Sequence, residues 1–161
     1  MGHGGNVIEE LTADHRELEQ LFARIELVPV GDRERRELAD ELTVELVRHS
    51  VTEERYLYPA VREHIDGGDA PADKGLEEHA MVEELLKELE HRPADDPLFD
   101  DLVAKLRLEV GAHVRDEEER LFPRLAAATT PQALDDLGDE IREAKKTTPA
   151  RPRPSDPDTP P

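Results

Sequence analysis

Two segments of the sequence repeat one polar pattern, in which a histidine is followed four positions later by a glutamate. The segments span positions 49–59 and 113–123, so corresponding residues differ by 64, and two further histidines obey the same offset. The six residues are His15, His49, Glu53, His79, His113 and Glu117. On a helix, side chains four residues apart lie on one face, about 6 Å apart along the axis. Imidazole and carboxylate groups converging from such faces predict a metal site.

The places that these residues occupy say more than the spacing alone. Acidic residues fill 40 of 161 positions, so a carboxylate four residues after a histidine is expected often by chance. All six residues, however, fall in the apolar seams of helical patterns, where Leu or Val would otherwise pack. Burying two carboxylates with four imidazoles costs free energy unless something satisfies them. Metal coordination is therefore predicted, and a hydrogen-bonded His–Glu network that only sets helix register is the alternative.

The donor set restricts the metal. The chain has no cysteine, which excludes thiolate zinc sites, iron–sulfur clusters and disulfides. Imidazole and carboxylate suit iron, manganese, zinc or nickel better than calcium or magnesium. Six ligands are too many for one tetrahedral zinc and fit two six-coordinate ions bridged by Glu53 and Glu117. The offset then assigns the first two histidines to one ion and the last two to the other. About two positions on each ion remain for solvent or an oxygen species.

Helices must carry these residues. Apolar residues recur every three or four positions in four stretches, which are separated by breaks around 27–31, 65–71 and 93–96. The two halves of the sequence align at the offset of 64 without a gap. The pattern predicts an all-α fold, an antiparallel up-down four-helix bundle built from a duplicated helical hairpin.

Several local features refine this expectation. Pro59 lies within the periodic part of the second helix, where a kink or a tightened turn is expected. Leu76 is expected to face inward from the third helix. A short fifth helix is expected over Pro131–Lys146, which gives a bundle domain at 1–146 and a disordered Pro-rich tail at 147–161. The expected helix caps are Asn6, Asp32, Asp95 or Asp96, and Thr130.

The charge excludes several partners. The chain carries 40 acidic and 21 basic residues, a formal net charge of −19. Nucleic acid and anionic membranes are not expected partners, because phosphate binding needs clustered Lys and Arg. The apolar runs are far too short to span a membrane, and no apolar signal core follows Met1. A cytoplasmic protein is expected.

The ordered set of motifs resembles a known family. After each His-x-x-x-Glu comes a leucine, an aromatic residue and a proline, and a single histidine lies 34 positions before each copy. Over about 7–125 this order is similar to the hemerythrin-like, or HHE cation-binding, family. The resemblance implies a non-haem di-iron centre inside a four-helix bundle, with an oxo or hydroxo bridge between two iron ions. It implies that the ligands are His15, His49, His79 and His113, bridged by Glu53 and Glu117.

One position departs from the oxygen-carrying members of that family. The resemblance implies a second histidine one turn after the histidine of the third helix, and Glu83 stands there instead. Reversible oxygen carriage is therefore not expected. Glu83 is a lower-ranked candidate for a terminal ligand, as is Glu19 at the duplicated position, with a surface role as the alternative for both.

Residues around the predicted ligands have expected roles of their own. Tyr56 comes three places after Glu53 and could hydrogen-bond to the site or ligate a metal, with ordinary packing as the alternative. Its duplicated position is Arg120, so such a role would make the two halves unequal. Glu54 and Glu118 could accept a proton from a ligand imidazole, with solvent exposure as the alternative.

The function expected from the resemblance and the open metal positions is reaction with a small oxidant. A di-iron protein of this kind would react with dioxygen, hydrogen peroxide or nitric oxide, including catalase-like decomposition of peroxide in oxidative or nitrosative stress. The alternative is a metal-binding module that senses iron, oxygen or redox state without catalysis.

Overall fold

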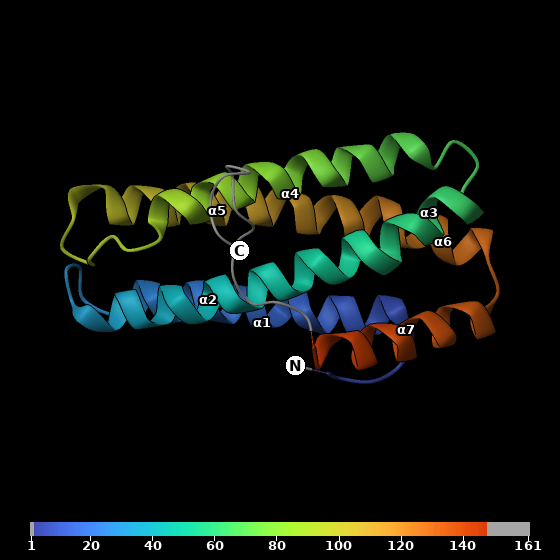
Figure 1. Cartoon of the computed structure of the whole chain (residues 1–161), viewed down its shortest axis with the longest axis horizontal. Coiled ribbons are helices and arrows are strands. Elements are labelled where there is room, and N and C mark those ends of the chain that lie inside the picture. The colour runs from blue at the N-terminus through green and yellow to red at the C-terminus, as the bar shows by residue number, and fades with distance from the viewer. Residues whose placement is uncertain (1, 148–161) are drawn as a thin grey trace.

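Four long helical segments lie side by side, and a shorter helix packs beside the first of them (Figure 1). The computed structural model describes residues 2–147, so nearly all of the predicted tail lies outside the described residues. The helices are α1 (Val7–Leu27), α2 (Arg33–Thr52), η1 (Glu53–Leu57), α3 (Tyr58–His64), α4 (Asp69–Leu89), α5 (Pro97–Asp116), η2 (Glu117–Leu121), α6 (Phe122–Ala128) and α7 (Pro131–Lys145).

Two hairpins make up the bundle. The α1–α2 and α4–α5 turns lie together at one end, and the connection from α3 to α4 lies at the other (Figure 1). Neighbouring segments therefore run in opposite directions. This confirms the predicted all-α antiparallel bundle with an additional C-terminal helix, which ends at Lys145, one residue earlier than predicted.

Side-chain caps fix where the helices begin, because the first N–H groups of a helix have no partner within it. Asn6 accepts a hydrogen bond from the backbone of Glu9, whose side chain bonds back to Asn6. The side chains of Asp32, Asp96 and Thr130 each accept a hydrogen bond from a backbone N–H at the starts of α2, α5 and α7. These caps agree with those expected from the sequence.

Each long segment that carries a His-x-x-x-Glu pattern contains one widened, π-helical turn, η1 or η2. The expected interruption of the helix near Pro59 is therefore present, but the turn is widened, so the expectation of a tightened turn was wrong. A proline inside an α-helix lacks an N–H and its ring clashes with the carbonyl four residues earlier. In the wider turn, the backbone N–H of Tyr58 bonds to the carbonyl of Glu53, five residues back. Pro59 then sits in the first turn of α3, where its missing N–H costs little.

The apolar core is divided into two clusters by a polar layer. One cluster fills the end near the hairpin turns and includes Leu42, Leu86 and Leu106. The other lies under α3, α6 and α7 and includes Val61 and Leu125. In every helical segment, the predicted ligands lie between residues of the first cluster and residues of the second. Apolar side chains therefore enclose the six predicted ligands from both directions along the bundle axis.

The last helix, α7, lies against the start of α1. Its Leu134 and Ile141 are buried in the second cluster. Gly138 allows the close approach, because a Cβ atom there would lie 2.7 Å from the carbonyl oxygen of Gly5. The helix thereby covers the side of the bundle where α1 and the N-terminal residues meet.

Candidate metal centre

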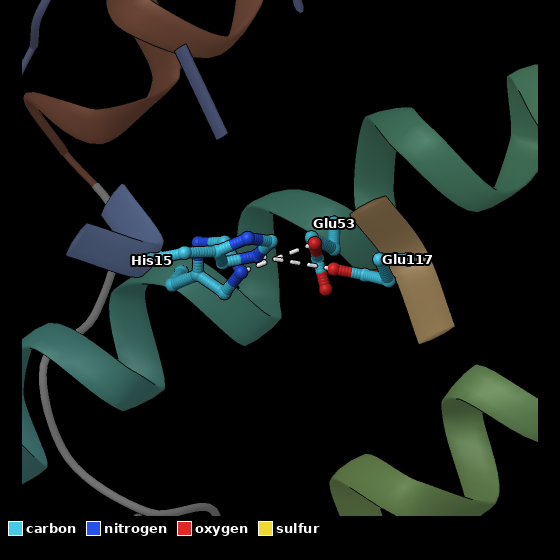
Figure 2. Close-up of side chains that lie close together, drawn as sticks. His15, Glu53 and Glu117 are labelled. Carbon is cyan, nitrogen blue, oxygen red and sulfur yellow. Dashed lines mark ion pairs between the residues drawn. The ribbon is translucent and has the colours of Figure 1, made fainter. Parts of the chain in front are cut away.

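All six predicted ligands are buried at one level of the bundle. His15 comes from α1, His49 from α2, His79 from α4 and His113 from α5, while the glutamates stand at the first positions of η1 and η2. The least exposed of them are His15 and Glu53, each with no exposed surface. Figure 2 shows the side chain of His15 facing the carboxylates of Glu53 and Glu117.

Each carboxylate faces both pairs of histidines. Oε2 of Glu53 lies 3.1 Å from Nε2 of His49, and its Oε1 lies 3.0 Å from Nε2 of His79. Oε1 of Glu117 lies 3.2 Å from Nε2 of His15, and its Oε2 lies 3.2 Å from Nε2 of His113. One oxygen of each glutamate thus points toward each half of the site, which is the arrangement that bridging carboxylates require.

Two overlapping groups of ligand atoms result. One is formed by His15, His49, Glu53 and Glu117, and the other by Glu53, His79 and His113. Within each group, the ligand atoms all lie within 4.8 Å of one another. The pairing of histidines agrees with the one expected from the offset of 64.

Several atoms that face the centre of the site have no hydrogen bond. They are His15 Nε2, His49 Nε2, Glu53 Oε2 and Glu117 Oε1. The ion-pair distances between them are short, but the groups are not aligned for hydrogen bonding. Buried polar atoms without partners are costly, and in native proteins they call for a bound group. If the residues formed only a hydrogen-bonded network that sets helix register, these atoms would have hydrogen-bond partners. They have none, and all four are of types that bind metal ions, so the residues fit a metal.

The outward nitrogen of every imidazole bonds to a carboxylate. Nδ1 of His15 lies 2.6 Å from Glu118, and Nδ1 of His79 lies 2.9 Å from Glu54. An ionised carboxylate can only accept, so each Nδ1 donates its proton and each Nε2 is left to face inward. The expected role of Glu54 and Glu118 as acceptors is therefore confirmed. Such outer carboxylates fix the ring and strengthen it as a ligand.

Asp14 and Glu78 complete this outer ring. Nδ1 of His49 lies 3.0 Å from Oδ2 of Asp14, and Nδ1 of His113 lies 2.9 Å from Oε1 of Glu78. The two acids also differ by 64 in position, so the duplication extends to the residues behind the ligands. This role of Asp14 and Glu78 was not predicted from the sequence, although each residue directly precedes a seam histidine.

The buried carboxylates hold protons on the rings in the absence of metal. Burial lowers the pKa of all four imidazoles, but the facing carboxylates outweigh it, so the pKa of each histidine is raised. For His49, burial is outweighed by the negative charges of Glu53 and Asp14 and by the hydrogen bond to Asp14, which together raise its pKa to about 10. Against the upward effect of burial, His49 and the other histidines hold the pKa of Glu53 well below its ordinary value. Metal would take the place of these protons at Nε2.

The tyrosine that reaches the site is Tyr58, so of the two roles considered for Tyr56 the contact with the site was wrong and ordinary packing was right. The hydroxyl of Tyr58 donates to Oε2 of Glu117 at 3.1 Å and lies 3.3 Å from Oε1 of Glu53 and from Nε2 of His79. Burial and the two carboxylates raise the pKa of Tyr58 far above its ordinary value, so the phenol keeps its proton. Tyr56 instead packs against the second apolar cluster and lines a surface groove beside α7. The alternative of ordinary packing holds for Tyr56.

A glycine makes room for this tyrosine. Gly75 of α4 is buried, and a Cβ atom there would lie 2.4 Å from Cζ and from the hydroxyl of Tyr58. Leu76, expected to face inward, is exposed instead. At the position that duplicates Tyr58 stands Phe122, whose ring stacks on His15 with centroids 6.0 Å apart and an interplanar angle of 3°. The duplicated site is therefore unequal at this aromatic pair.

The lower-ranked ligand candidates lie further out. Glu83 lines a small cleft with His79 and Glu54, and its carboxylate lies 3.7 Å from Nζ of Lys87. Glu19 is about half exposed and pairs with Arg16 at 3.2 Å. Neither belongs to the groups of converging ligand atoms found among residues 2–147.

Comparison with known proteins defines the class. The chain matches the hemerythrin HHE cation binding domain over residues 6–147. It belongs to that family and is a hemerythrin-like domain whose histidine and glutamate clusters can bind metal. Within the described part of the chain, no helix has the length and apolar character needed to cross a membrane.

Individual relatives extend this result. An uncharacterised hemerythrin-like protein of Schizosaccharomyces pombe is 26% identical over 156 residues, which cover 96% of this chain and 76% of that protein. A DNA nickase of Nostoc sp. is 28% identical over 141 residues, covering 87% of this chain but 39% of the nickase. The crystal structure of a hemerythrin HHE cation binding domain-containing protein, the Rv2633c homologue from Mycobacterium kansasii, is similar with a TM-score of 0.79 at 26% identity. That match covers 90% of this chain and 88% of the other.

Proposed function

We propose that this chain binds two iron ions between its hairpins and uses them to react with a small oxidant, namely dioxygen, hydrogen peroxide or nitric oxide. The observation that carries the proposal is the division of the six predicted ligands into two overlapping groups that share Glu53, whose two oxygens face different groups. Ligands of this type suit iron, and membership of the HHE family supports a metal in this place.

The proposed ligand set leaves room for a reaction. His15 and His49 would hold one ion, His79 and His113 the other, and the carboxylates of Glu53 and Glu117 would bridge them. Two nitrogens and two bridging oxygens for each ion leave about two of six positions for an exogenous ligand. Two iron ions would supply a two-electron couple between their ferrous and ferric states. Decomposition of peroxide needs such a couple, because two molecules of peroxide give two of water and one of dioxygen.

The protein contributes an enclosed site and a hydrogen-bond donor. Apolar clusters above and below the ligands restrict water, which strengthens the electrostatic effect of every charged group in the site. Tyr58 presents a protonated hydroxyl to the edge where Glu53, His79 and Glu117 meet. That hydroxyl is placed to donate a hydrogen bond to an oxidant bound beside these residues.

Metal analysis of the purified protein tests the proposal. We expect two irons per chain and dioxygen release from peroxide at one molecule for every two consumed. His113→Ala and Glu53→Ala are expected to lose metal and turnover together. His64→Ala, at the partly exposed C-terminal end of α3, is the matched control and should lose neither. A single zinc per chain, or two irons with no reaction toward any of the three oxidants, contradicts the proposal.

A sensing role without catalysis is the second candidate. Four inward-facing buried atoms lack hydrogen bonds, so metal removal is expected to destabilise the bundle. Two bound irons, a large loss of thermal stability on chelation and negligible turnover would favour sensing. The cytoplasmic location remains a prediction from the sequence.

A further inference from the structure

A buried lysine connects the last helix to the metal centre. The side chain of Lys145 in α7 is 2% exposed, and its Nζ lies 2.6 Å from Oε2 of Glu10 and 2.6 Å from Oδ1 of Asp14. Lysines are almost never this buried unless they are paired. His3, Glu10 and Asp14 together have the composition of a cation site, and the ammonium of Lys145 binds two of these three residues. The contacts therefore fix Lys145 at a defined point of the fold.

The same aspartate holds a predicted ligand. Oδ1 of Asp14 accepts a hydrogen bond from Nζ of Lys145 and lies 3.0 Å from Nε2 of His3. The other oxygen, Oδ2, lies 3.0 Å from Nδ1 of His49. With one oxygen held from the side of α7, the other is aimed at the imidazole. Glu10, which holds the same ammonium, is itself fixed by hydrogen bonds from the backbone of residues 3 and 4 and from Arg142. A continuous series of contacts thus runs from α7 to the ring of His49.

The other half of the site is built differently. Glu78, the counterpart of Asp14, bonds to His113, and among the described residues that histidine is its one ion-pair partner. Its side chain is 27% exposed, against 9% for Asp14. The position that duplicates Glu10 is Lys74, which is 53% exposed and pairs with Asp116 at 3.2 Å. His49 and His113 occupy equivalent places, but the carboxylate behind His49 is paired with a buried lysine and the carboxylate behind His113 is not.

We propose that Lys145 is a positioning residue for the half of the metal centre that contains His49, and that it makes the two metal positions unequal. This inference rests on the proposed function. The ammonium offsets the charge of Asp14, so His49 is a weaker donor than His113, and it fixes the direction in which Asp14 accepts from the ring. Outer partners of metal-bound histidine set both the orientation and the basicity of the ring. The competing interpretation is that Lys145 only fastens α7 to α1.

Three variants separate these interpretations. Lys145→Met combined with Glu10→Gln removes the ammonium together with one carboxylate, so no extra buried charge is left behind. Lys74→Met is the matched control, because it removes a lysine near the outer carboxylate of the other half. Leu134→Ala weakens the apolar docking of α7 and leaves the contacts of Lys145 in place. Circular dichroism and thermal melting confirm that each variant folds.

The readouts are made on protein loaded with Co(II), without turnover. Competition with a chromogenic chelator gives the affinity for each of the two Co(II) ions. Proton NMR on protein with ¹⁵N-labelled histidine follows the Nδ1–H signals of the four histidine ligands. In the double variant, we expect the His49 signal to shift and exchange faster with water, and one of the two affinities to fall about 10-fold. The other three signals should stay in place. Lys74→Met should change none of these quantities, and Leu134→Ala should lower only the melting temperature.

An unchanged His49 signal with both affinities intact in the double variant overturns the inference. The same holds if Leu134→Ala shifts that signal equally, because docking of α7 would then be the cause. If the unmodified chain fails to bind two Co(II) ions, the proposed function fails and this inference fails with it. If the unmodified chain binds two and the double variant behaves identically, the inference about Lys145 alone is lost.

Discussion

The hydroxyl of Tyr58 lies 3.1 Å from Oε2 of Glu117, a residue 59 positions later in the other hairpin. This contact crosses the pseudo-twofold relation between the halves of the bundle. The equivalent position in the second half carries Phe122, whose ring stacks on His15 and has no hydroxyl to donate. The carboxylates are therefore approached by one phenol from one side. This difference gives the centre a polar edge and an apolar edge.

Tyr58→Phe tests the role of that hydroxyl. We expect two irons per chain to remain, because the ligands are untouched and phenylalanine already fits the equivalent place at position 122. Loss of hydrogen bonds to buried carboxylates should lower the stability of the metal-free protein by about 1–3 kcal/mol. Peroxide consumption should fall at least about 10-fold, as for loss of a hydrogen-bond donor in the transition state. Tyr56→Phe is the control, and equal effects at both positions would contradict the assignment.

Gly75→Ala tests the space that the tyrosine needs. The added Cβ would lie 2.4 Å from Cζ of Tyr58, so the ring must move or α4 must shift outward. Overpacking of this kind costs about 1–3 kcal/mol, which chemical denaturation can measure. Gly111→Ala is the matched control, because its nearest neighbour would be the guanidinium of Arg115 at 3.5 Å. That change should stabilise α5 by about 0.5–1 kcal/mol. A neutral Gly75→Ala would show that Tyr58 does not fill this space.

The bundle and the convergence of the six predicted ligands could be predicted from the sequence, because the second half repeats the pattern of the first. Helical periodicity and an offset of 64 place four histidines and two glutamates on facing seams without knowledge of any contact. The second copy confirms the register of the first. Helix caps were equally accessible, since Asn6 and Asp32 have short side chains that satisfy N–H groups locally.

The choice between the two tyrosines was not accessible from α-helical spacing. Three residues after Glu53, an α-helix would bring Tyr56 to the same face, whereas the π turn brings Tyr58, five residues on, over the carboxylate. Pro59 signals an interrupted helix but not whether the turn widens or tightens. Glycine adds nothing to a hydrophobic pattern, so the pattern points to Leu76 as the inward-facing residue. The buried position is Gly75, one residue earlier. Lys145 lies outside the duplicated segment, and no repeat marks it.

Glu78→Gln tests the outer ring of carboxylates. The amide oxygen can still accept from Nδ1 of His113, but its charge is gone, so the imidazole becomes a weaker ligand. We expect the affinity for one of the two metal ions to fall about 10–100-fold, measured by chelator competition. Glu77→Gln, at the exposed neighbouring position, is the control and should retain both affinities. A loss shared equally by both ions would mean that Glu78 acts on the whole bundle instead of on one half.

Protons and metal compete for the same nitrogen atoms, which gives the protein opposite pH dependences with and without metal. In the metal-free bundle, the pKa of His49 is about 10, against an ordinary value of 6.5, and the pKa of each other predicted histidine ligand is also raised. Below pH 6.5, folded and unfolded chains both carry these protons, so the stabilisation by charged imidazoles is complete. As the pH rises from 6.5 toward 10, the unfolded chain releases protons first. For His49, the free energy of unfolding should then fall by on the order of 1 kcal/mol per pH unit, and the raised pKa values of His15, His79 and His113 should add to the fall in the same direction.

Metal binding should show the reverse trend over the same range. An ion bound at Nε2 displaces the proton there, so binding at pH 7 should release protons and the affinity should rise with pH. Urea denaturation of metal-free protein at pH 6, 7, 8 and 9 measures the first trend. Calorimetry in buffers of different ionisation enthalpy measures the released protons. Metal-free stability that stays constant or rises between pH 6.5 and 9 would mean that the carboxylates do not hold protons on these rings.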